Sequence, residues 1–212
     1  GITAHLREDR RHIKDKDIER LMAEIELPLN FEMAATNEMK DIALRLKPNA
    51  VCIVPEKRME ITTEGGLDLI SQFDRLKAIC HQLNDNGLRI SLFIEPDLRQ
   101  IETAARLEVP VIELHTGTYS ELRADNKKNE LKRIQRAVDY ANELGIECHA
   151  GHGLNYENVG PIAAIKKIAE LNIGHFLIGE AIFTGLTNAI NKMKSIMAEA
   201  RKVEVSSNDS SI

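Results

Sequence analysis

The feature that most restricts the fold of this chain is a regular alternation of short apolar runs with stretches of helical periodicity. The runs are bounded by Pro, Gly, Asn or polar residues, which is typical of buried parallel strands. Between the runs, apolar residues recur three and four positions apart. The alternation predicts βα units with right-handed crossovers. The predicted strands cover residues 1–6, 29–34, 50–55, 89–95, 109–115, 147–152 and 174–179.

Individual residues predict where several helices begin and end. Thr36 and Asp97 are suited to cap helix N-termini, and Pro48 stops the helix that follows Thr36. Gly87 and Gly145 are suited to close helices at their C-terminal ends. The last helices are expected over about 157–171 and 184–202, and the polar tail 203–212 is expected to be disordered.

Seven βα units predict an α/β fold, and we interpret it as a (β/α)₈ TIM barrel whose first strand and helix are missing from this chain. An open doubly wound sheet is the alternative. The barrel is favoured because polar residues follow nearly every predicted strand, and in a barrel the carboxyl ends of all strands meet on one face. We expect a single domain over residues 1–202, N-terminally incomplete.

Composition restricts the environment and the partners. With 43% hydrophobic residues among 212, the chain can build one sizeable core. A formal net charge of −5 gives no overall attraction to nucleic acid or to anionic lipid. Cys52, Cys80 and Cys148 form no Cys-x-x-Cys pair, which indicates a reducing, cytoplasmic location and no cysteine zinc site. No apolar run is long enough to cross a bilayer, so we expect no membrane association.

Residues able to carry acid–base chemistry stand at the predicted strand ends. A single histidine there is more often structural than catalytic, so the prediction depends on the convergence of several. Glu32 is the strongest candidate, because it is flanked by apolar residues and a buried carboxylate is costly unless paired or functional. The candidates are His5, Arg7, Arg10, Arg11, His12, Glu32, Glu56, Glu95, Glu113, His115 and His152.

Glycines near the end of the chain predict an anion site. Gly151 and Gly153 bracket His152, and missing Cβ atoms let backbone N–H groups approach an oxyanion. Gly174 and His175 adjoin the last predicted strand. Loops after the final two strands are the usual phosphate site of this barrel.

Seven segments together resemble the pyridoxine 5′-phosphate synthase family, over residues 1 to about 201. They are HLREDRRH at 5–12, NFEMA at 30–34, VPEKR at 54–58, TTEGGLD at 62–68, ELHTG at 113–117, AGHGL at 150–154 and LNIGH at 171–175. The resemblance implies a cytosolic (β/α)₈ barrel, typically a homo-octamer, with no metal or organic cofactor. It implies condensation of 1-deoxy-D-xylulose 5-phosphate with 3-amino-2-oxopropyl phosphate to pyridoxine 5′-phosphate, phosphate and water.

The resemblance also implies residue roles. The family's first strand carries an Asn-x-Asp-His motif that contacts both substrates, and this chain lacks it. We further expect Glu113 or His115 to orient the His152 ring, and a nearby carboxylate to raise the pKa of His152. By resemblance, His5 and Glu32 are proton acceptors, His152 is the proton donor, Arg7, His12 and Thr62 contact the deoxyxylulose phosphate, and Gly153, Gly174 and His175 contact the amino-ketone phosphate.

Two other functions remain open at this point. One is a metal-dependent sugar-phosphate epimerase on the same barrel, with His5, Glu32, His115 and His152 as ligands. The other is a phosphate-binding subunit made inactive by loss of the first unit.

Overall fold

A computed structural model gives an α/β fold built on one parallel sheet, and it describes residues 1–62 and 65–207, with side chains to residue 202. The seven strands are hydrogen-bonded in chain order, as repeated βα units require. Their bounds are β1 Ile2–His5, β2 Leu29–Met33, β3 Ala50–Ile53, β4 Arg89–Ile94, β5 Val111–His115, β6 Glu147–Gly151 and β7 Ile168–Asn172.

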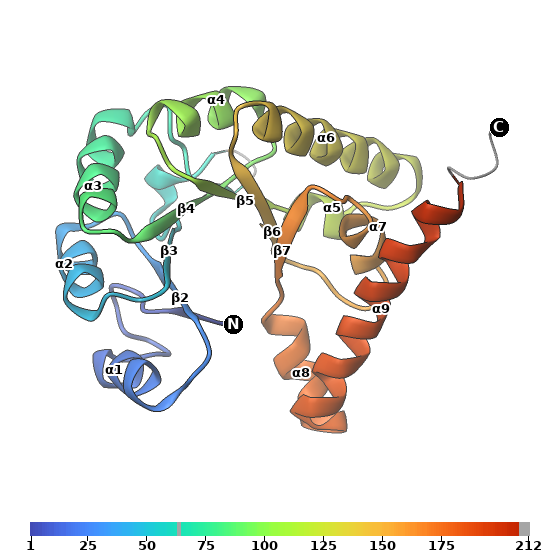
Figure 1. Ribbon diagram of the computed structural model, residues 1–212, viewed down its shortest axis with the longest axis horizontal. Coiled ribbons are helices and arrows are strands. Elements are labelled where there is room, and N and C mark those ends of the chain that lie inside the picture. The colour runs from blue at the N-terminus through green and yellow to red at the C-terminus, as the bar shows by residue number, and fades with distance from the viewer. Residues whose placement is uncertain (63–64, 208–212) are drawn as a thin grey trace.

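Helices cover the outer face of the curled sheet (Figure 1). A short 3₁₀ helix, Arg58–Glu60, lies in the connection that follows β3. The α-helices are α1 Asp15–Glu24, α2 Asn37–Leu46, α3 Phe73–Asp85, α4 Leu98–Arg106, α5 Gly117–Glu121, α6 Ala124–Glu143, α7 Val159–Ala163, α8 His175–Thr184 and α9 Leu186–Ser207.

The helix ends that were predicted from a capping or closing residue are confirmed. Thr36 Oγ1 accepts the backbone N–H of Met39 at the start of α2, and Asp97 Oδ1 accepts that of Arg99 at the start of α4. Gly87 and Gly145 have φ of +77° and +75°, the left-handed conformation that closes helices.

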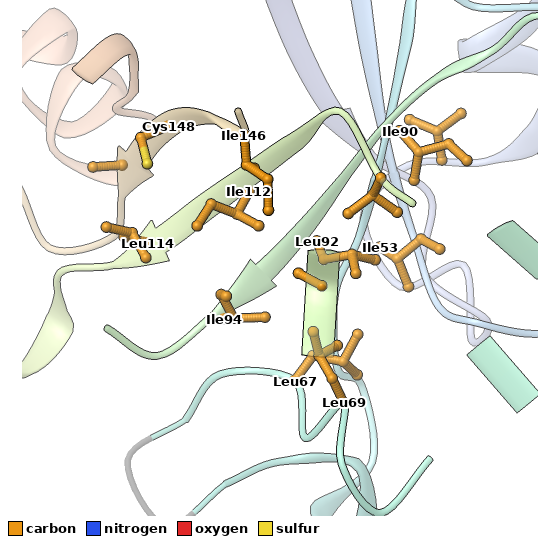
Figure 2. Packing of buried hydrophobic residues seen from close by; sticks show 14 of the residues in the cluster. Ile53, Leu67, Leu69, Ile90, Leu92, Ile94, Ile112, Leu114, Ile146 and Cys148 are labelled. Atoms are coloured by element: carbon orange, nitrogen blue, oxygen red, sulfur yellow. The ribbon is translucent and has the colours of Figure 1, made fainter. Parts of the chain in front are cut away.

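The two faces of the sheet differ sharply in polarity. Alternate residues such as Ile90, Leu92 and Ile94 of β4 point outward and pack under the helices, together with Ile112 and Leu114 of β5 (Figure 2). The remaining residues of the same strands point into the curl, and these include Ser91, Glu113 and His115. The hydrophobic core is thus a layer between sheet and helices, and the inner face is left for polar groups.

The sheet is open on one side. Among the described residues β1 pairs only with β2 and β7 only with β6, and the gap lies beside the N-terminus in Figure 1. Across it, the Thr3 hydroxyl donates to Asn172 Oδ1 at 2.9 Å through side chains alone. The expected gap between the first and last strands is confirmed, and the sheet has one strand fewer than an eight-stranded barrel.

The last strand was wrongly placed by sequence. The apolar run 174–179, expected to be a strand, lies in α8, where the Ile178 N–H bonds the Gly174 carbonyl. β7, Ile168–Asn172, instead overlaps the end of the segment expected to be helical, 157–171. A register shift in the β6–β7 pairing places Ile168 and Leu171 both against the core. That spacing of three imitates a helix.

At the C-terminus, α9 continues to Ser207, beyond the boundary expected at residue 202. Residues 208–212 lie outside the described part of the chain, so disorder of that tail stays a prediction.

Candidate active site

One large cavity, of about 1430 Å³, opens at the carboxyl ends of the strands. Parallel strands bring those ends to a single face, so residues far apart in sequence meet there. Of the residues predicted from sequence, the cavity wall includes His5, Arg7, Glu32, Glu113, His115, His152, Gly153, Gly174 and His175.

On the β1–β3 side, His5 lies between two carboxyl groups. Its Nε2 is 2.8 Å from Glu56 Oε1, and its Nδ1 is 3.8 Å from Glu32 Oε2. Burial raises the pKa of Glu32, and the nearby His5 opposes that rise. A carboxyl group among apolar residues is expected to shift in this direction, and His5, Glu32 and Glu56 form a trio of acid–base groups.

Glu113 of β5 is a second carboxyl group, deeper in the curl. It is 3% exposed, and its Oε2 accepts the Asn172 amide at 2.9 Å and faces the Cys52 thiol at 3.7 Å. Burial, reinforced by the charge of Glu32, raises the pKa of Glu113 to about 8. Glu113 is thus a neutral acid at pH 7, and it can donate a proton where Glu32 can accept one.

His152 lies opposite, against the ring of His115. The ring centroids are 4.9 Å apart, and the His115 Nδ1 is 2.7 Å from Glu95 Oε1. Burial and the neighbouring His115 lower the pKa of His152 and outweigh the carboxylate of Glu121, so the expectation of a raised pKa was wrong. Of the two candidates to orient His152, only His115 has a ring contact with it, since Glu113 is engaged with Asn172 and Cys52.

The glycine turn and the start of α8 border the same cavity. His152 and Gly153 have φ of +85° and +74°, and a Cβ on Gly153 would lie 2.7 Å from the Ser120 Cβ. Gly174 caps α8 and His175 is its first residue. The helix N-terminus offers unpaired N–H groups and a positive dipole end, the features that bind phosphate in this position.

Arg7 and His12 border a second cavity of about 910 Å³. Arg7 also lines the first cavity, and its Nε is buried without a hydrogen-bond partner. The lining of this second cavity combines the guanidinium groups of Arg7 and Arg11 with the imidazoles of His5, His12 and His175, donors that suit a second anion.

Among the residues to which the resemblance gives a role, Thr62 is the one that the structure does not bring to either wall. Its buried Oγ1 has no hydrogen-bond partner, and the same loop contributes Gly65 to the first cavity. The role implied for Thr62 therefore stays a prediction.

The residues suggested as epimerase ligands do not form one metal-binding group. His5 adjoins Glu32 and Glu56, whereas His115 adjoins Glu95 and His152. Within residues 1–62 and 65–207, no group of three or more His, Cys, Asp or Glu side chains is arranged to hold a metal ion.

Asn172 is a residue of this site that the sequence reasoning missed. It ends β7, bonds Glu113 and bridges to Thr3, but the wrong placement of the last strand removed it from the strand ends. The Ile168–Asn172 run has polar residues at alternate positions toward its end, but the spacing of Ile168 and Leu171 across the register shift obscured this signal. Glu56 and Glu95 stood among the strand-end candidates without an assigned role, and the structure places each on a histidine.

Comparisons with known proteins agree with this arrangement. The pyridoxine 5′-phosphate synthase of Rhodospirillum rubrum is 60% identical over 201 residues, covering 94% of this chain and 81% of that protein. The enzyme of the same name from Zymomonas mobilis is also 60% identical over 201 residues, covering 95% and 78%. The chain thus spans about four fifths of the length of these relatives.

Solved structures of low sequence identity share the fold alone. A flavocytochrome b2 variant with sulfite bound has a TM-score of 0.61 at 11% identity, covering 96% of this chain and 56% of that one. A 4-hydroxy-2-oxoglutarate aldolase has a TM-score of 0.56 at 13% identity, covering 92% and 80%.

Two further observations bear on the class of protein. None of the helices in the described part of the chain has the length and apolar character that a bilayer crossing requires. The model of the family described as pyridoxal phosphate biosynthesis protein PdxJ matches residues 1–199, nearly the whole chain. The chain therefore belongs to the PdxJ family of vitamin B6 biosynthesis, to which its relatives named pyridoxine 5′-phosphate synthase correspond.

Proposed function

We propose that this protein condenses 1-deoxy-D-xylulose 5-phosphate with 3-amino-2-oxopropyl phosphate to give pyridoxine 5′-phosphate, phosphate and water. The observation that carries the proposal is one cavity that joins a proton-accepting trio, a neutral carboxylic acid and a histidine pair. Anion-binding features border it on two sides. Two phosphorylated substrates and repeated proton transfers require this combination.

The proposed chemistry needs groups that donate protons and groups that accept them. The amine attacks the ketone and water leaves to form an imine, which asks for an acid at the departing oxygen. Later steps take protons from carbon, release phosphate and close the ring, which asks for bases. In this proposal His5 and Glu32 accept protons, and His152 donates one.

The two phosphates bind at different walls in this proposal. Arg7 and His12, with Thr62 on the adjoining loop, hold the deoxyxylulose phosphate. Gly153, Gly174 and His175 hold the amino-ketone phosphate at the glycine turn and the N-terminus of α8. We further propose a homo-oligomer in the cytoplasm, an octamer by family resemblance.

The test is incubation of the purified protein with both substrates and detection of pyridoxine 5′-phosphate by mass spectrometry. Product that requires both substrates supports the proposal, and no product under any substrate combination contradicts it. Added chelator distinguishes the epimerase alternative, because a metal-dependent enzyme loses activity with its metal.

Arg7→Ala tests the assignment of the two anions. Loss of a charge-assisted bond should weaken the deoxyxylulose phosphate by about 1.5–3 kcal/mol and the amino ketone much less. The control is Arg10→Ala, since Arg10 pairs with Asp15 and Glu38 and lines neither cavity. Equal weakening of both substrates by Arg7→Ala would contradict the assignment.

A further inference from the structure

Glu95 directly follows the last residue of β4, and three hydrogen-bond donors lie around its buried carboxyl group. Its Oε1 accepts the His115 Nδ1–H at 2.7 Å and the Gly66 N–H at 2.9 Å, and its Oε2 lies 3.5 Å from Arg133 Nη2. The residue is 3% exposed and is not part of either cavity wall. Three donors on one carboxyl group are the arrangement expected of its ionised form.

The bond to Glu95 fixes the side of the His115 ring that faces the cavity. With Nδ1 directed to Glu95, Nε2 points to Gly117, where a Cβ would lie 2.5 Å from His115 Nε2 and 3.1 Å from His152 Cδ2. Both rings therefore rest on the bare Cα of Gly117. Within the described chain the His152 ring has no hydrogen-bond partner, so its contact with His115 is its main support.

Glu95 also holds the loop that follows β3. Gly66 fits only because it lacks a side chain, since a Cβ there would clash with the Glu95 backbone nitrogen. The Gly66 carbonyl accepts the Thr62 N–H at 2.8 Å, and Gly65 reaches the cavity wall. One carboxylate thus joins a wall of the cavity to the histidine pair.

We propose that Glu95 is a positioning residue, which fixes the orientation of His115 and through it sets how readily His152 takes up a proton. The inference deepens the proposed function, because His152 is the proton donor there. Glu95 itself touches no reacting atom.

Electrostatics give the expected sign. The His115 ring, whose centroid lies 4.9 Å from that of His152, lowers the pKa of His152, so the place of that ring sets the size of the effect. The other titratable groups that act on His152 are Glu121 of α5, which favours its charge, and His175 of α8, which opposes it. Arg133 of α6 offsets part of the Glu95 charge.

The test is an NMR titration of the His152 ring in the protein without substrate. His115→Asn keeps a donor for Glu95 but removes the imidazole that lowers the pKa of His152, so that pKa should rise by about half a unit or more. Glu95→Gln keeps an acceptor for Gly66 and His115, and it should give a smaller rise in the pKa of His152. Both variants are designed to keep the local hydrogen bonds, and circular dichroism checks that they fold.

Glu56→Gln is the matched control, because it removes the carboxylate from the other histidine, His5, on the far side of the cavity. It should leave the titration of His152 unchanged. An unchanged titration of His152 in both His115→Asn and Glu95→Gln overturns the inference. No substrate takes part, so failure of the proposed reaction is detected separately, by the product assay.

Discussion

Two buried carboxyl groups in one cavity behave differently because their partners differ. Glu32 faces His5, which partly restores the stability of its charged form, whereas Glu113 faces an amide and a thiol. Desolvation acts on both, and the charge of Glu32 further disfavours a second charge on Glu113. The neutral form is therefore favoured in both groups, with an opposing contribution from His5 at Glu32 alone.

Glu32→Gln removes the proposed base while it keeps the size of the side chain. We expect the fold to persist and kcat to fall by at least about 10²-fold, the usual contribution of a general acid or base. Steady-state assays of product, with circular dichroism as the folding check, measure both. Turnover near the parental rate would demote Glu32 to a structural residue.

Glu113→Gln tests the protonated state through stability. Because folding raises the pKa of Glu113 from 4.5 to about 8, its contribution is fully present below pH 4.5 and is lost as pH rises through 8. The amide keeps an acceptor for Asn172 and cannot ionise. The urea midpoint of the variant should thus fall less between pH 5 and 8.5 than that of the parent, and parallel declines would show that Glu113 is ionised in the fold.

His152→Asn keeps a hydrogen-bond donor but cannot act as an acid. Since the pKa of His152 is lowered in the free protein, we expect it to gain its proton when a phosphate binds beside Gly153 and His175. Parental activity should then decline as pH rises through the pKa of the complex. Single-turnover mass spectrometry should show the variant stalled before product release.

The control for this experiment is His81→Asn, because His81 lies on α3 beside Glu108 and lines neither cavity. Product formed by His152→Asn at the rate of this control would end the proton-donor assignment.

At the scale of elements, the sequence predicted helix ends that depend on neighbouring residues. It failed for a strand whose position depends on pairing with another strand. Caps at Thr36 and Asp97 and closing glycines act within a few residues, so the sequence contains their whole cause. The position of β7 depends on a register shift against β6, which no local pattern encodes. The same limit hid Asn172, whose role arises only when β7 lies beside β6 and across from β1.

Gly66→Ala tests the packing of the loop against β4. A Cβ at this position would meet the backbone of Ile94 and Glu95, which cannot move aside as a flexible side chain can. We expect a loss of about 1–3 kcal/mol in the free energy of unfolding, measured by urea denaturation. Gly160→Ala in α7 is the control, because open space surrounds that position. Equal stability of the two variants would show that the loop is not packed on the strand.

At the scale of the whole molecule, the sequence could predict which polar residues lie on the inner face of the sheet. It could not predict how deeply each of them is buried. Alternation along a strand assigns residues to faces, and it placed Glu32 and Glu113 on one face. The curl of the sheet then decides which of them lose contact with water. Sequence therefore predicted the members of the site, and only the structure separates the two carboxyl groups by burial.

The open side of the sheet leaves one apolar helix face uncovered. Helix α8 has no buried residue within the described chain, and Ile178, Ile182 and Phe183 are 62%, 78% and 88% exposed. The helix lies beside the gap in Figure 1, where β1 and β7 each have one edge without a strand partner among the described residues. Exposed apolar patches and free strand edges drive association.

We expect the 212-residue chain to self-associate more as its concentration rises. The double variant Ile182→Lys, Phe183→Lys should shift this equilibrium toward the monomer. Burying one large apolar side chain contributes about 1.5–3 kcal/mol to the free energy of association. Replacing two such side chains with lysines should therefore weaken association by about tenfold or more. Sedimentation velocity over a concentration series measures the change. Met59→Lys is the control, because Met59 is 83% exposed but stands on the short 3₁₀ helix away from α8. If the double variant and the control sediment alike, the α8 face does not carry the association, and the free strand edges become the remaining cause.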